Sequence, residues 1–287
     1  MIITPEINAL FSLLEDPDQD VYEVVSHRLL QFGAPIMPHL EELWEHAPNE
    51  SVMERVEGLM HRLHYLDVLK DFTAWNDAGH HELMPAILLT AKFLYPDIQS
   101  GKTIFNIERL KRNVWLELNH YLTPLEQINV FFNILYGYFG LKGNAYDYNK
   151  PEEFLVPFII DSKKGNQTGN GILSLLLCEL LEIPVRYIPI PNQFVLAYIK
   201  PETSSNKQGT GANIEFFIDP CQGQIFTFHH LQDYLQKIGE PVTPSLFLPQ
   251  SNKEVIARLL SDFSKCFTKP SQKYISEELT ELVSLLR

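Results

Sequence analysis

The sequence predicts an α+β protein that is predominantly helical, with one region of mixed helix and strand. Most of the 287 residues repeat apolar side chains at the spacing of an amphipathic helix. Residues 163–220 differ, because a polar Gly/Asn loop is followed by one very apolar helix, an Ile-Pro turn and three β-rich runs. A hydrophobic fraction of 45% without a low-complexity tract indicates a globular chain. We therefore expect helical layers beside a core in which a helix packs on an antiparallel sheet.

The first 80 residues predict a region of paired helices. The predicted helices are Glu6–Leu14, Val21–Phe32, one with Pro35 and Pro38 at its start that runs to His46, and Ser51–Leu66. Ser51 with Glu54 fits a capping box. The segment LLEDPDQDVYEVVSHRLLQFG resembles a HEAT-type repeat, in which an Asp-Pro turn joins two helices and Asp18 or Asp20 caps the second. Two such pairs leave an apolar face bare, so we expect this region to pack on the rest of the chain.

The same periodicities predict the remaining elements. Helical patterns cover Leu83–Leu122, Pro124–Gly140, Glu152–Asp161, Leu231–Ile238, Lys253–Phe267 and Tyr274–Leu286, and a fourth strand is predicted over Gln224–Phe228. Residues 201–213 are rich in Gly, Ser and Thr, which predicts an exposed and mobile hairpin loop. We divide the chain into a helical region over 1–80, a core over 81–245 and a C-terminal helical pair over 246–287.

Charge and composition argue against several classes of function. The net charge of −13 repels phosphate backbones and anionic lipid, so we expect no nucleic acid and no membrane as partner. No apolar run reaches the roughly 20 residues of a membrane helix, and MIITPEINALF lacks the pattern of a secretory signal. Three widely spaced cysteines suit reduced thiols in a cytoplasmic protein. Cysteine and histidine spacings fit no metal site, so we expect no metal and no cofactor.

Residues 139–220 carry motifs of a known family. They read Phe139-Gly140-Leu141-Lys142-Gly143-Asn144, then Gly165 in the polar loop, Leu181-Glu182-Ile183-Pro184 in the turn, and Phe217-Ile218 before Asp219-Pro220. In these motifs the chain resembles the transglutaminase-like (papain-like) core, most closely the SirB-type bacterial branch. The resemblance implies a nucleophilic Cys at the start of the helix, a His on the following strand and an Asp on the strand after that. Those three positions fall on Gln167, Gln193 and Asp219.

Glutamine at two of the three positions removes the chemistry of a cysteine-type enzyme. A glutamine amide is not nucleophilic and does not titrate near neutral pH, so Gln167 cannot attack and Gln193 cannot act as a base. Loss of the nucleophile alone costs on the order of 10⁶ in turnover in comparable triads. We therefore expect no catalytic residue at this site. An alternative nucleophile is Cys221, which would need His229 or His230 as its base.

Polar side chains remain at the mapped positions and are candidates for binding a ligand. They are Asn166, Gln167, Thr168, Asn170, Gln193 and Asp219. A helix N-terminus offers N–H donors and a partial positive charge, which suit a carboxylate or a peptide group. The alternative interpretation is that these residues bond to one another and cap the helix.

The sequence thus favours a non-catalytic transglutaminase-like protein that binds a protein or peptide as a cytoplasmic scaffold. One alternative is a Cys-dependent amidase, peptidase or acyl transferase that uses Cys221. Another is a small-molecule binder in the vestigial cleft.

Overall fold

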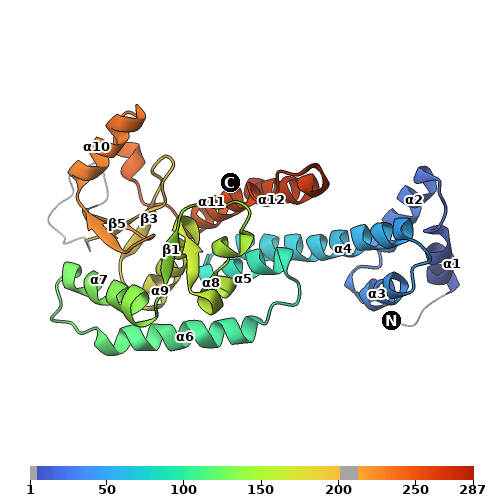
Figure 1. The fold of residues 1–287 in the computed structure, drawn as a ribbon, viewed down its shortest axis with the longest axis horizontal. Helices are drawn as coiled ribbons and strands as arrows, with labels where there is room; N and C mark the ends of the chain where they lie inside the picture. Colours follow the sequence, from blue (N-terminus) through green and yellow to red (C-terminus); the bar gives the residue numbers. More distant parts are fainter. Residues whose placement is uncertain (1–4, 201–212) are drawn as a thin grey trace. The chain divides into compact units, whose positions relative to one another are not determined.

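The computed structural model describes residues 5–200 and 213–287. Contacts divide the chain into two compact units, residues 1–74 and 75–287. Helices dominate both units, and the second also contains a four-stranded antiparallel sheet and a short parallel strand pair (Figure 1). The predicted α+β, predominantly helical class is therefore confirmed. The predicted hairpin loop over 201–213 lies outside the described residues, apart from Asn213.

The first unit is built from helices. Its elements are α1 (Pro5–Leu13), α2 (Gln19–Leu30), the 3₁₀ helix η1 (Ala34–Ile36), α3 (Met37–Glu45) and most of α4 (Glu50–Asp77). The Asp18 side chain accepts from the backbone N–H of Asp20 at 2.9 Å and caps α2, so Asp18 is the cap among the two predicted candidates. Buried residues from these helices form a core of their own, among them Ile7, Leu29, Leu40, Val56 and Leu63.

Helix α4 is longer than its predicted range of 51–66. Tyr65, Val68, Phe72 and Trp75 continue the buried stripe at helical spacing beyond the predicted end. The predicted capping box of Ser51 and Glu54 is also wrong, because the helix already begins at Glu50. The side chain of Asn49 accepts from the N–H of Val52 at 3.0 Å and takes the capping role instead.

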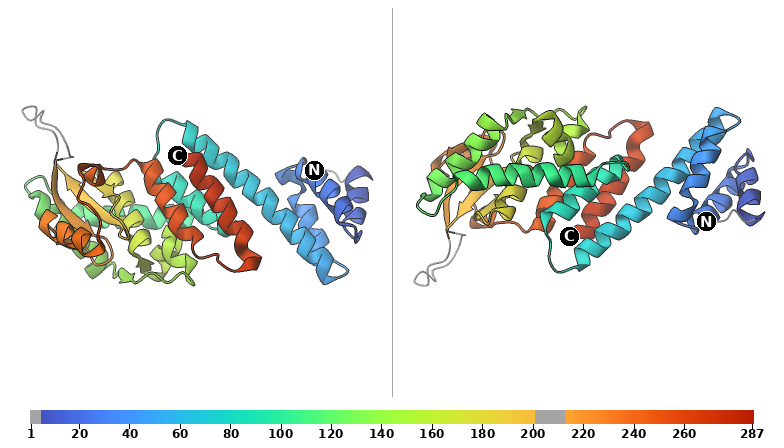
Figure 2. Two further views of the ribbon diagram at one scale, coloured as in Figure 1. Left: turned by 90° about the horizontal axis from the view of Figure 1, so that it is seen from above. Right: turned by 90° about the horizontal axis from the view of Figure 1, so that it is seen from below.

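Helices also make up most of the second unit. They are α5 (Leu83–Leu94), α6 (Ser100–Glu117), α7 (Pro124–Phe132), the π-helix η2 (Asn133–Tyr138), α8 (Val156–Ser162), α9 (Gln167–Leu180), α10 (Phe228–Ile238), α11 (Asn252–Ser264) and α12 (Lys273–Leu286), besides short 3₁₀ turns. A capping box of Thr123 with Glu126 starts α7, and one of Ser251 with Glu254 starts α11. Figure 2 shows α11 and α12, in red, lying side by side.

The sheet is built from β3 (Val185–Ile188), β4 (Val195–Ile199), β5 (Ile214–Asp219) and β6 (Gln224–Phe226), antiparallel and in that order. Ala197 and Phe217 pair across β4 and β5, and both belong to an apolar cluster with Leu231 and Leu235 of α10. Their neighbours Leu196 and Ile218 point to the opposite face and are fully buried as well. Both faces of the sheet are therefore covered.

Helix α9 packs against this sheet through a close backbone approach. A Cβ atom added to Gly171 would lie 2.4 Å from the ring of Phe194, so only glycine fits there. Beside the start of α9, strand β1 (Lys142–Asn144) runs parallel to β2 (Lys164–Asn166). The predicted helix on an antiparallel sheet is thus present, and its first turn adjoins a second, smaller pair of strands.

Candidate functional site

The site is built around the first turn of α9. Gln167 is the first residue of this helix, which also contains Cys178. The side chain of Asn166 accepts from the N–H of Gly169 at 2.9 Å and caps the helix. Asn166, Thr168 and Asn170 are fully buried, and Gln167 is 9% exposed. Polar groups buried to this extent need hydrogen-bond partners.

The three positions implied by the resemblance meet in space. Nε2 of Gln167 donates to Oε1 of Gln193 at 2.7 Å and lies 3.4 Å from Oδ1 of Asp219. Asp219 is the last residue of β5, as the sequence suggested. Gln193 lies in the turn before β4 and not on the strand, because Asn192 adopts a left-handed conformation with φ of 59°.

This cluster of Gln167, Gln193 and Asp219, called here the Gln–Gln–Asp cluster, contains one titratable group. The carboxylate of Asp219 accepts from the N–H of Cys221 at 2.8 Å as well as from Gln167. The other two members are amides, which can donate and accept hydrogen bonds and can neither attack a carbonyl nor take up a proton. The two glutamines therefore supply hydrogen bonds but neither a thiol nor an imidazole, and the carboxylate of Asp219 is the one ionisable group of the cluster.

The alternative nucleophile, Cys221, borders the cluster, and within residues 5–200 and 213–287 no histidine hydrogen-bonds to its thiol. Its Sγ lies 3.7 Å from the carbonyl oxygen of Asn144. Burial, and then the charge of Asp219, raise the pKa of the Cys221 thiol. Both effects favour the protonated thiol over the reactive thiolate.

The two histidines proposed as its base are engaged on α10. His229 pairs with Asp233 at 3.7 Å, one helical turn away, and its side chain is 80% exposed. Nδ1 of His230 lies 2.9 Å from the hydroxyl of Thr227 at the start of the same helix. The other two cysteines also have raised pKa values, Cys178 through complete burial and Cys266, at about 12, mainly through burial.

The strands β1 and β2 adjoin the first turn of α9, and their pairing was not predicted from the sequence. Residues 142–144 and 164–166 are the same tripeptide, Lys-Gly-Asn, and they pair residue for residue in a parallel register. A Cβ atom on Gly143 would lie 1.8 Å from the carbonyl oxygen of Cys221, so glycine is required for this approach. Nδ2 of Asn144 donates to Oε1 of the buried Glu153 at 2.8 Å.

Helix α11 supplies a second set of buried polar contacts that the sequence did not reveal. Thr168 donates to Oδ2 of Asp262 at 2.9 Å, and Asp262 is 2% exposed. The same carboxylate pairs with Arg258 and with Lys265, each at 2.7 Å. Tyr146 shares a 2.9 Å hydrogen bond with Thr168, and burial raises the pKa of Tyr146 to about 12.

No group of three or more His, Cys, Asp or Glu side chains among residues 5–200 and 213–287 is arranged to hold a metal ion. Among the helices of the same described ranges, none combines the length and apolar character that a membrane crossing requires.

Comparison with known proteins gives the chain its family. The model of the transglutaminase-like superfamily matches residues 102–261, which include Gln167, Gln193 and Asp219, and it ends one residue before Asp262 of α11. A UPF0162 protein of Vibrio cholerae is 23% identical over 204 residues, which cover 70% of this chain and 72% of that protein.

Two further relatives align over 203 residues, which cover 69% of this chain and 71% of each relative. They are the UPF0162 protein YchA of Escherichia coli K12, at 21% identity, and protein SirB1 of Salmonella typhimurium, at 20%. No solved structure matches the chain. The family model spans more than half of the sequence, and the relatives that align over about 70% of the chain are UPF0162 and SirB1 proteins. The chain therefore belongs to the transglutaminase-like superfamily, in its SirB-type branch.

Proposed function

We propose that this protein is a non-catalytic member of its superfamily that binds a protein or peptide as a scaffold. The observation that carries the proposal is the 2.7 Å hydrogen bond between Nε2 of Gln167 and Oε1 of Gln193. The bond joins two amides at the positions where the family resemblance implies a thiol and an imidazole. A cysteine-type acyl transfer needs a thiolate and a base within hydrogen-bond reach of each other, and this pair supplies neither.

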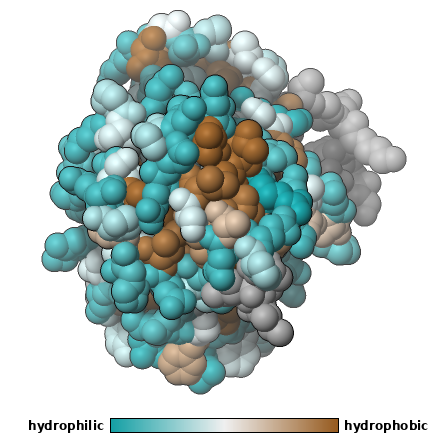
Figure 3. All heavy atoms as spheres, turned by 90° about the vertical axis from the view of Figure 1, so that its right-hand side faces the viewer, coloured by the Kyte–Doolittle hydropathy of each residue, from teal (hydrophilic) through white to brown (hydrophobic). Residues whose placement is uncertain are grey.

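Exposed apolar side chains support a protein or peptide as the partner. Phe105, Trp115 and Leu116 on α6 are 67%, 64% and 65% exposed. Large apolar and aromatic side chains in contact with water are typical of surfaces that bind another chain. The face of the first unit drawn in Figure 3 also gathers apolar side chains, in brown, inside a hydrophilic surround.

Unpaired cysteines support the cytoplasm as the place of action. Cys178, Cys221 and Cys266 are all free thiols in this structure. Oxidising compartments favour disulfides, whereas reduced thiols persist in the cytoplasm.

The first prediction concerns activity. The wild-type protein should neither cleave peptide substrates nor transfer acyl groups from glutamine donors, and Cys221→Ala should leave both results unchanged. Iodoacetamide labelling at about pH 6 should be slow at all three cysteines, because an ordinary thiol with a pKa of about 8.5 is almost wholly protonated there. The labelled cysteines can be identified by mass spectrometry of a tryptic digest.

A rebuilt pair provides the matched control. In Gln167→Cys/Gln193→His, a new thiol faces an imidazole in place of an amide, so Cys at 167 should label faster than in Gln167→Cys alone. Rapid labelling of Cys221 in the wild type, abolished when His229 or His230 is replaced, would instead establish the Cys-dependent enzyme.

The second prediction concerns the partner surface. Peptides selected from a random library on the whole protein should bind less tightly, by at least about tenfold, after Trp115→Ser and Leu116→Ser, because truncation of central apolar anchors costs about 2 kcal/mol or more. Fluorescence anisotropy of a labelled peptide measures the change. Ile238→Ser on α10, where the side chain is 36% exposed, is the control and should leave affinity unchanged. If Ile238→Ser weakens peptide binding as much as the substitutions at Trp115 and Leu116 do, α6 is not the binding face.

A further inference from the structure

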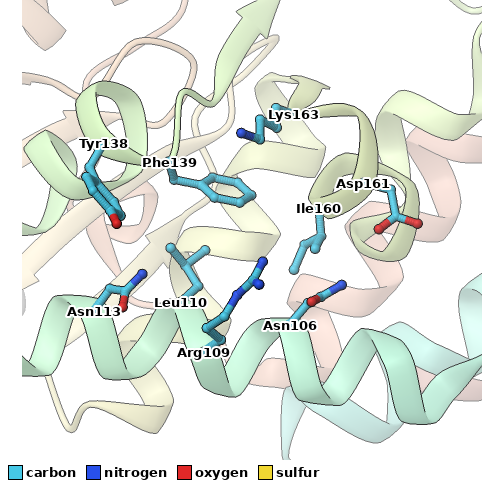
Figure 4. A pocket seen from close by; sticks show the side chains of 9 residues that line it. All are labelled: Asn106, Arg109, Leu110, Asn113, Tyr138, Phe139, Ile160, Asp161 and Lys163. Carbon is cyan, nitrogen blue, oxygen red and sulfur yellow. The ribbon is translucent and has the colours of Figure 1, made fainter.

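A polar pocket away from the Gln–Gln–Asp cluster lies between α6, the end of η2 and the end of α8. Its volume is about 700 Å³, and it is lined by Asn106, Arg109, Leu110, Asn113, Tyr138, Phe139, Ile160, Asp161 and Lys163. Figure 4 shows these side chains around the hollow, with Arg109 rising from α6 between Phe139 and Ile160. None of the residues of the Gln–Gln–Asp cluster lines it. A hollow of this size accommodates a small organic molecule.

Two cations of the pocket are available to a ligand. The side chain of Arg109 makes no hydrogen bond or ion pair with any residue in the described parts of the chain. Lys163 follows α8 in a left-handed conformation, and its ammonium group lies 5.4 Å from the ring centre of Phe139, again without an ion pair to a described residue. Its contact with the aromatic face holds the ammonium group beside the hollow.

The acid in the lining does not neutralise these cations. Asp161 pairs with Lys102 at 2.7 Å, one turn before Asn106 on α6. In Figure 4 its carboxylate points away from Arg109. Free cations in a hollow are unexpected in a chain with 36 acidic and 23 basic side chains, because acidic neighbours normally pair with them.

The remaining lining suits the non-ionic part of a ligand. Asn106, Arg109 and Asn113 are three and four residues apart, so α6 presents two amides and a guanidinium along one face. Leu110 and Ile160 supply apolar surface, and the ring of Tyr138, which is 75% exposed, stands at the rim. An aromatic or aliphatic group can contact these side chains while an oxyanion meets the cations.

We propose that this pocket binds a small organic oxyanion, a carboxylate or phosphate carried on an aromatic or aliphatic group. The planar guanidinium of Arg109 can donate two parallel hydrogen bonds to such a group, and Lys163 adds a second positive charge. The two asparagine amides can donate to the remaining oxygen atoms. The apolar lining distinguishes such a ligand from a bare inorganic ion.

The test is a calorimetric titration of the full-length protein at low salt with phenyl phosphate, benzoate, inorganic phosphate and phenol. Phenyl phosphate or benzoate should bind, inorganic phosphate should bind more weakly, and phenol should not bind. The comparison of phenyl phosphate with benzoate decides between a phosphate and a carboxylate. Added salt should weaken the binding, because the cations are open to solvent.

Variants locate the site. Arg109→Gln should weaken the preferred ligand at least tenfold and Lys163→Gln several-fold, whereas Arg112→Gln, on the same helix and outside the lining, should change affinity by less than twofold. Asn113→Leu keeps both cations and fills part of the hollow, so it should also weaken binding. Circular dichroism establishes that each variant is folded.

Two outcomes would overturn the proposal. In the first, the wild type shows no saturable binding of any of the oxyanions at ligand concentrations up to about 10 mM, so that any affinity would be too weak for a formed site. The other is an equal loss in Arg109→Gln and Arg112→Gln, which would mean that diffuse surface charge, and no pocket, attracts the anion.

Discussion

Gln167 holds its two partners through a single nitrogen. One hydrogen of Nε2 is directed to Gln193 and the other to Asp219, so the amide forms a bridge between the turn before β4 and the end of β5. A cysteine is shorter and could not span both. The glutamine is therefore suited to fixing these two segments against α9, which is a structural use of a position that the family resemblance assigns to catalysis.

This bridge makes a prediction about stability. Gln167→Leu keeps the volume of the side chain and removes the donor, so Oε1 of Gln193 and Oδ1 of Asp219 each lose a part-buried hydrogen bond. We expect the free energy of unfolding to fall by about 1–3 kcal/mol. Urea denaturation followed by circular dichroism measures the change.

Gln236→Leu on the exposed side of α10 is the matched control and should stay within about 0.5 kcal/mol of the wild type. If both variants lose the same amount, the effect belongs to the new leucine and not to the bridge.

At this scale the sequence predicted the meeting of three residues with one local error. The length of α9 between Gln167 and the Ile183-Pro184 turn is set by helix geometry, so counting along the chain located the first position. The same count identified Gln193, which does contact Gln167, but it placed Gln193 on a strand, whereas the residue lies in the turn before β4. That turn depends on the left-handed Asn192, and asparagine tolerates this conformation without requiring it.

At the scale of elements, a buried polar chain joins α11 to the first turn of α9. The hydroxyl hydrogen of Thr168 is directed to Asp262, which leaves Tyr146 as the donor in its own bond to Thr168. Removal of one partner from a buried charged network is costly, because the others lose their hydrogen bonds together. The C-terminal helices are thus part of the support of the site, although they lie far from it in sequence.

Tyr146 gives this chain of contacts a dependence on pH. Burial raises the pKa of Tyr146 from 10.0 to about 12, so the folded protein keeps the phenol protonated where the unfolded chain ionises it. A group with a raised pKa stabilises the fold fully below the unfolded value, here about 10, and that contribution is lost as the pH rises towards about 12. In Tyr146→Phe the free energy of unfolding should therefore fall less steeply between these values.

Equilibrium unfolding at several pH values from about 9 to 12 measures the two slopes. Tyr121→Phe, whose side chain is 85% exposed, should retain the wild-type slope. A wild-type slope in Tyr146→Phe would show that other groups account for the alkaline loss.

The sequence predicted most helices and strands but not the parallel pairing of β1 with β2. The helices and the antiparallel strands follow from local periodicity, which a single sequence displays. The parallel pairing of β1 with β2 joins three residues to three others across 19 intervening positions, and it involves no apolar alternation. The repeated Lys-Gly-Asn tripeptide was the one available signal. Helix α4 extends beyond its predicted end at Leu66, and Val68, Phe72 and Trp75 continue its apolar spacing, so its full length is visible in the sequence.

At the scale of the whole molecule, an acidic protein carries an isolated cationic hollow. The net charge of −13 acts over the entire surface and is screened within about 10 Å at moderate salt, whereas Arg109 and Lys163 act at contact distance. Overall charge therefore disfavours the approach of extended polyanions such as nucleic acid, whereas a small anion can be held by two adjacent cations. This hollow could not be predicted from the sequence, because its lining residues are 57 positions apart at the extremes.

The last prediction concerns the helical region over residues 1–80, expressed alone. We expect it to be poorly stable, because a chain of this length buries only about 60% of its unfolded surface and because two helical pairs leave an apolar face bare. A cut after residue 80 also removes the partners of Trp75, whose indole donates to the carbonyl of Glu82 at 2.9 Å and whose ring packs edge-on against His81. Thermal unfolding followed by circular dichroism should show a broad transition well below that of the full chain. A fragment ending at residue 90 restores both partners and should recover only part of the difference. A sharp, cooperative transition of the 1–80 fragment at the temperature of the full chain would show instead that the region folds as an independent domain, and its own buried core around Leu29, Leu40 and Val56 would then be sufficient for stability.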